Sequence, residues 1–92
     1  MKILIIGSGG REHALAWKCA HDISVEHIFV CPGNAGTHLE DKISNVEINA
    51  SDFGAIENFC ISKEISLVII GPEQPLVDGL TNYLQSKGID TV

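Results

Sequence analysis

The sequence contains few cysteines, and no two of them lie close together. Cys19, Cys31 and Cys60 form an odd set, and no C-x-x-C pair occurs in the 92 residues. Disulfide frameworks and zinc sites depend on even sets or close pairs of cysteine, so neither is expected and no metal ligand is assigned. We expect reduced thiols in a cytoplasmic protein, with Cys19 and Cys60 as small core residues.

The sequence also has little positive charge. It carries 6 Lys and Arg against 12 Asp and Glu, which gives a net charge of −6. A nucleic-acid or acidic-membrane surface needs a basic footprint, so neither partner is expected. A single phosphate can still be bound, because the backbone N–H groups at a helix N-terminus supply local positive potential.

Long hydrophobic runs are missing as well. The first run, Ile3–Ile6, meets Gly7 after four residues, which is too short for a signal peptide. No run approaches the roughly 20 apolar residues of a membrane-spanning helix. A hydrophobic content of 45% with 20% charged residues is typical of a globular protein, and 92 residues correspond to one domain, 1–92.

Short β-branched runs alternate with helical patterns along the chain. Strands are expected at Lys2–Ile6, His27–Cys31, Ser66–Ile70 and, more weakly, in "NVEIN" at 45–49. Helices are expected at Arg11–His21, in "THLED" at 37–41, after an N-cap at Ser51, and from Pro75 to a stop at Gly88. The final "IDTV" is typical of a strand that has just begun, so we expect the amino-terminal piece of a longer protein.

This alternation predicts an α/β fold of Rossmann-like type, with a parallel sheet between two layers of helices. In a parallel sheet, the loops after the strands meet at one edge, where ligands bind. The loops after the three strong strands are Gly7–His13, Pro32–Thr37 and Gly71–Gly79, and all are rich in Gly, Pro and polar residues. One crevice at this edge is therefore the predicted site.

The first loop only partly matches the dinucleotide fingerprint G-x-G-x-x-G. Gly7 and Gly9 fit, but Glu12 stands at the third glycine. The second strand ends in Cys31 and Pro32, without the acid that would accept ribose hydroxyls. NAD and FAD are therefore not expected. A smaller anion on the backbone N–H groups of the glycine turn remains possible, and so does a turn that serves packing alone.

Taken together, the three loops resemble phosphoribosylamine–glycine ligase, also called glycinamide ribonucleotide synthetase. The resemblance rests on "GSGGREHALAWK" at 7–18, "PGNAGT" at 32–37 and "GPEQPLVDG" at 71–79, in the family's order and spacing. It covers the whole chain. The family is much longer, with an ATP-grasp body and a small carboxy-terminal domain, so the chain resembles its amino-terminal, pre-ATP-grasp domain.

The resemblance implies an ATP-dependent ligase of de novo purine synthesis. Such an enzyme joins glycine to 5-phosphoribosylamine through a glycyl phosphate, giving glycinamide ribonucleotide, ADP and phosphate. ATP and Mg²⁺ (or Mn²⁺) would be held by the ATP-grasp part of the full-length enzyme. The 92 residues alone would bind no cofactor and show no activity, and the remaining domains of the same chain would be their partner. A stand-alone nucleotide-binding or regulatory module of the same architecture is the alternative.

The resemblance also points to substrate-binding residues, and to no catalytic residue within this chain. The candidates are Gly7, Gly9, Gly10, Arg11, Asn34, Thr37 and Glu73. The glycines would contact the sugar phosphate through the backbone. Arg11 is either a phosphate ligand or a solvated arginine at a helix start. Glu73 would accept hydrogen bonds from the ribose or the amine, or else only favour a helix N-terminus.

Overall fold

The computed structural model describes residues 1–7, 10–32, 42–49, 51–71 and 77–91. The strands among these residues are β1 (Lys2–Gly7), β2 (His27–Pro32), β3 (Ile43–Asn45) and β4 (Leu67–Ile70). The helices are α1 (Gly10–Ala20), α2 (Phe53–Ser62) and α3 (Val77–Ser86). None of the described helices is long and apolar enough to cross a membrane.

The strands form a parallel sheet in the order β3-β2-β1-β4, which confirms the predicted α/β fold. The chain first builds outward from β1 to β3 and then returns to place β4 on the other side of β1. The order therefore reverses beside β1, and ligands of such sheets bind at this reversal, outside the carboxyl ends of the strands.

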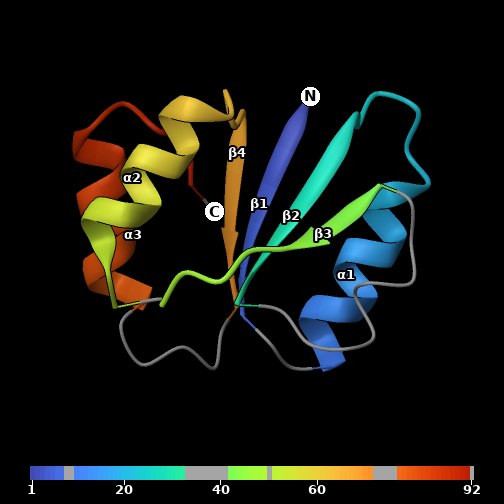
Figure 1. Ribbon diagram of the computed structural model, residues 1–92, viewed down its shortest axis with the longest axis horizontal. Coiled ribbons are helices and arrows are strands. Elements are labelled where there is room, and N and C mark those ends of the chain that lie inside the picture. The colour runs from blue at the N-terminus through green and yellow to red at the C-terminus, as the bar shows by residue number, and fades with distance from the viewer. Residues whose placement is uncertain (8–9, 33–41, 50, 72–76, 92) are drawn as a thin grey trace.

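Side chains of β1 alternate between two hydrophobic cores, one on each face of the sheet. Leu4 and Ile6 join the core under α2 and α3, together with Ile56, Leu80 and other buried residues. Ile3 and Ile5 join the core under α1. Figure 1 shows this three-layer arrangement, with α1 on one side of the sheet and α2 and α3 on the other. A strand covered on both faces must be apolar throughout, which explains the uninterrupted run in β1.

Two predicted boundaries are wrong. The weak strand lies at Ile43–Asn45 and not at 45–49: the Val46 N–H still donates to the Val30 carbonyl of β2, but the Ile48 N–H donates to the Val46 carbonyl and makes no ladder bond. The N-cap of α2 is Asp52, whose side chain accepts from the Ala55 N–H at 3.1 Å. The Ser51 hydroxyl donates to Asn49 instead.

The predicted end of α3 and the predicted strand start near the end of the sequence agree with the structure. Gly88, at φ +79°, follows α3 as predicted. Thr91 bridges Val68 in parallel, so the predicted strand start at the end of the sequence is confirmed. The helix predicted in 37–41 and the predicted helix start at Pro75 lie outside the described residues.

All three cysteines are free thiols, as expected, but their places in the fold differ from the prediction. Cys60 is buried in the core, whereas Cys19 is only partly buried. Cys31, which was not assigned to the core, is fully buried.

Candidate functional site

The carboxyl ends of β1, β2 and β4 lie side by side at one edge of the sheet (Figure 1). Gly7 pairs with Pro32, the last residue of β2. The Gly71 N–H donates to the Ile6 carbonyl at 2.9 Å, which joins the end of β4 to the end of β1. The segments that carry the three predicted loops therefore begin next to one another, at the point where the strand order reverses.

Gly7 has a backbone conformation that requires glycine. Its φ is +147° and it is buried, so a side chain would be strained at this position. The chain leaves β1 here, and α1 begins only a few residues later, at Gly10. The positive end of the α1 dipole thus faces the edge where β1 ends.

The structure describes the position of only some of the other predicted site residues. Arg11 lies in the first turn of α1, close to the end of β1. Gly9, Asn34, Thr37 and Glu73 lie outside the described residues. The structure thus brings together the starting points of the three loops, and the contacts of these residues with a substrate stay predictions.

Cys31 shapes this edge in a way the sequence did not indicate. Its thiol donates to the Ile48 carbonyl at a distance of 2.7 Å, which ties the end of β2 to the segment that follows β3. Burial raises the pKa of Cys31 to about 11, so the group stays a neutral donor. No local pattern could have predicted this bond, because its partner lies 17 residues further along the chain.

Two other titratable groups make hydrogen bonds to polar neighbours. His27 begins β2, at the opposite end from Pro32, and its Nε2 lies 2.7 Å from the Ser44 hydroxyl. Burial, with a contribution from Lys2, lowers the pKa of His27. On α3, the hydrogen bond from the Tyr83 hydroxyl to Glu57 raises the pKa of that tyrosine. Within the described ranges, no group of three or more His, Cys, Asp or Glu side chains could hold a metal ion.

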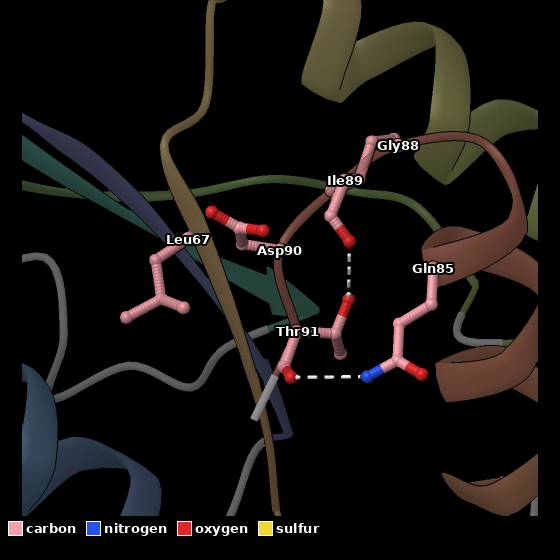
Figure 2. Close-up of a pocket in the computed structure, with 6 residues that line it drawn as sticks. All are labelled: Leu67, Gln85, Gly88, Ile89, Asp90 and Thr91. Carbon is pink, nitrogen blue, oxygen red and sulfur yellow. Dashed lines mark hydrogen bonds between the residues drawn. The ribbon is translucent and has the colours of Figure 1, made fainter.

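A cavity of about 530 Å³ lies away from the three loops, beside the outer edge of β4 (Figure 2). It is lined by Leu67, Gln85, Gly88, Ile89, Asp90 and Thr91. Figure 2 shows Gln85 and Thr91 joined to each other, through the bond from the Gln85 amide to the Thr91 carbonyl at 3.5 Å. No predicted site residue lines this cavity, so the edge at Gly7 remains the candidate site.

Comparison with known proteins agrees with this geometry. A family profile described as "Phosphoribosylglycinamide synthetase, N domain" matches residues 1–92. The chain belongs to this family.

Several curated relatives of this chain carry the name phosphoribosylamine–glycine ligase, and a human relative carries the name of a trifunctional purine biosynthetic protein. The chain is 53% identical over 89 residues to the phosphoribosylamine–glycine ligase of Haemophilus influenzae, covering 97% of this chain and 21% of that protein. It is 51% identical over 88 residues to the human trifunctional purine biosynthetic protein adenosine-3, covering 96% of this chain and 9% of that protein. The chain thus spans only a small part of the length of these relatives.

Solved structures with low sequence identity share the fold. RSP, a Rex-family repressor, was solved in complex with β-NADH and superposes with a TM-score of 0.60 at 19% identity. The superposition covers 96% of this chain and 42% of the repressor chain. This likeness confirms the Rossmann-like fold of this chain.

Proposed function

We propose that the full-length protein is an ATP-dependent ligase that joins glycine to 5-phosphoribosylamine in purine biosynthesis. The observation that carries this proposal is the 53% identity over nearly the whole chain to a protein named phosphoribosylamine–glycine ligase. The first residues of the three loops lie together at one edge of the sheet. This supports the proposal, because the three motifs that carry the family resemblance begin at these residues. We place the enzyme in the cytoplasm, in line with its free thiols.

In this proposal, the 92 residues form the phosphoribosylamine side of the reaction cleft. Backbone N–H groups of the glycine turn, at the positive end of α1, would bind the sugar phosphate. Glu73 would accept hydrogen bonds from the ribose hydroxyls or the amine, since a carboxylate is an acceptor only and repels phosphate. These contacts would orient the amine for attack on the acyl carbon of glycyl phosphate.

ATP and magnesium would be held mainly by the rest of the polypeptide. When bound, magnesium would neutralise the phosphate charge of ATP. The stand-alone module is the weaker alternative, because the relatives that share this domain are much longer proteins.

The test is glycine-dependent ADP release with phosphoribosylamine as the acceptor. We expect the full-length protein to release ADP only when both substrates are present, and residues 1–92 alone to release none. A full-length protein that binds a nucleotide but forms no glycinamide ribonucleotide would contradict the ligase and favour a regulatory module.

A further inference from the structure

β3 is a short strand at one edge of the described sheet. It has three residues, and in the strand order β3-β2-β1-β4 its neighbour is β2. The Ile28 N–H donates to the Lys42 carbonyl just before β3, and the Val46 N–H just after it donates to the Val30 carbonyl. A strand this short makes few ladder bonds, so a side-chain bond across the same pair of strands contributes a large share of its attachment.

The side-chain bond between β2 and β3 joins His27 to Ser44. The His27 Nε2 lies 2.7 Å from the Ser44 hydroxyl oxygen. The His27 ring also packs on Phe29, the register partner of Ser44, with a distance of 4.7 Å between the ring centroids of His27 and Phe29. Phe29 in turn meets the Phe59 ring of α2 edge-on, at 5.1 Å between centroids. His27 thus connects the edge strand to the aromatic contacts between the sheet and α2.

The charges around His27 disfavour its protonated form. Lys2 on β1 is the register partner of His27, so both side chains lie on the same face of the sheet. Burial, and then the charge of Lys2, lower the pKa of His27. The Lys42 ammonium, before β3, donates to a backbone carbonyl of the segment before β2 at 3.0 Å. The Glu26 carboxylate, next in sequence to His27, lies 3.7 Å from the Met1 ammonium.

We propose that His27 is a pH-sensitive contact that holds β3: when the imidazole takes up a proton, it leaves the Ser44 hydroxyl for water and β3 loosens. A partly buried cation beside Lys2 is unfavourable, and His27 is the first residue of β2, where its side chain has access to solvent. The folded state binds its proton less readily than the unfolded chain. The contribution of His27 to stability is therefore complete above the ordinary value of 6.5 and is lost as the pH falls below it.

Loosening of β3 bears on the candidate site, and this step rests on the proposed function. Pro32, which pairs with Gly7, and Lys42, which precedes β3, are the described residues on either side of the segment that carries Asn34 and Thr37. Release of β3 frees one of these two ends. Phosphoribosylamine use is then expected to weaken in mild acid.

The experiment measures amide hydrogen exchange of the full-length protein from pH 7.5 to pH 5, by mass spectrometry with fragmentation of the peptides. Exchange rates are converted to protection factors, which removes the intrinsic effect of pH. His27→Gln keeps a hydrogen-bonding side chain that does not titrate in this range. His21→Gln is the matched control, because His21 is an exposed histidine on α1. Ser44→Ala removes the partner of His27.

In the wild type and in His21→Gln, the Ile28 and Val46 amides are expected to lose protection as the pH falls. The loss is up to about tenfold for each unit by which the folded pKa of His27 lies below the unfolded value. The Gly71 amide, bonded to β1, is expected to keep its protection. His27→Gln should show no loss in acid, and Ser44→Ala should already exchange faster at pH 7.5.

Four results would overturn the proposal. These are an equal acid loss in His27→Gln, a parallel loss at Gly71, full protection of β3 in Ser44→Ala, and a His27 pKa at or above 6.5 from exchange of its ring hydrogen. The last would mean that attraction of the cation to the Phe29 ring outweighs burial and Lys2. In kinetics, the KM for phosphoribosylamine should rise in acid more in the wild type than in His27→Gln, and equal rises would overturn the link to the site. Exchange is read without activity, so an inactive full-length protein would refute the ligase and leave the result on β3 intact.

Discussion

At the scale of single residues, substitution of Glu73 best distinguishes a role in substrate binding from a role in stability. It comes two residues after Gly71, whose N–H donates to the Ile6 carbonyl at the edge of the sheet. Loss of a charged hydrogen bond to substrate costs about 1.5–3 kcal/mol, so Glu73→Ala in the full-length enzyme should lower kcat/KM for phosphoribosylamine roughly 10- to 100-fold. The constants for ATP and glycine should change little.

A helix-stabilising role for Glu73 predicts a different result. Removal of an acid near a helix N-terminus costs about 0.3–1 kcal/mol of stability and leaves kinetics near normal. Steady-state constants measured beside a melting curve distinguish the two roles. A lower melting temperature with unchanged kinetics would remove Glu73 from the substrate site.

The three thiols should differ in reactivity. Burial raises the pKa of both Cys31 and Cys60 to about 11, and burial followed by the nearby Asp22 raises that of Cys19. Only Cys19 is partly exposed, so we expect iodoacetamide at pH 8 to label it first, and the other two only in denaturant. Peptide mapping by mass spectrometry gives the order, and native labelling of Cys31 as fast as Cys19 would contradict the fold at β2.

The same thiols predict a loss of stability in alkali. In the folded state the pKa of Cys31 and that of Cys60 lie above the ordinary thiol value of 9.0, so their contribution to the free energy of unfolding is complete below that pH and declines as the pH rises toward 11. A denaturation series across this range should show the free energy of unfolding falling. Cys60→Ala should make the fall shallower.

At the scale of elements, α2 and α3 end with the same hydrogen-bond pattern. In α2, Ile65 N–H donates to the Cys60 carbonyl and Glu64 N–H to that of Ile61. In α3, Ile89 and Gly88 make the equivalent bonds to Leu84 and Gln85. Both are Schellman ends, which place one residue in the left-handed region. That residue is Gly88 in α3, at φ +79°, but Glu64 in α2, at φ +57°.

The two ends predict opposite effects of substitution. Left-handed backbone costs a residue with a side chain about 1–2 kcal/mol, and glycine loses about 0.4–1 kcal/mol more entropy on folding. Glu64→Gly should therefore raise the free energy of unfolding by about 0.5–1 kcal/mol, and Gly88→Ala should lower it by a similar amount. Urea denaturation measures both, and a Glu64→Gly variant less stable than wild type would show that the Glu64 side chain has a stabilising contact.

At the scale of the whole molecule, the chain has a Rossmann-like fold, while its sequence departs from the dinucleotide fingerprint at two positions. The chain superposes on the repressor solved with β-NADH, at a TM-score of 0.60. Glu12 replaces the third glycine, and the place of the ribose-binding acid is taken by Cys31 and Pro32. We expect calorimetric titration with NADH or FAD to show no micromolar binding. RSP is the positive control for NADH, and comparable affinity in both proteins would overturn this expectation.

The strong strands and the end of α3 could be read from the sequence because each depends on nearby residues. A strand buried on both faces must be a continuous apolar run, as in Ile3–Ile6, and a left-handed helix end favours glycine, as at Gly88. The edge that carries the site was also predictable, since the carboxyl ends of parallel strands always share one edge. The family could be recognised because its three loop motifs occur in order along the chain.

Tertiary structure decided what depends on residues far apart in the chain. The position of β3 was set by its pairing with β2, in which Ile43, Ser44 and Asn45 lie beside Ile28, Phe29 and Val30. The bond from the Cys31 thiol to the Ile48 carbonyl joins residues on two segments that the pairing of β2 with β3 brings together. The placing of Gly7, Pro32 and Gly71 side by side likewise required the strand order, because pairing between strands is a contact that spacing along the sequence does not specify.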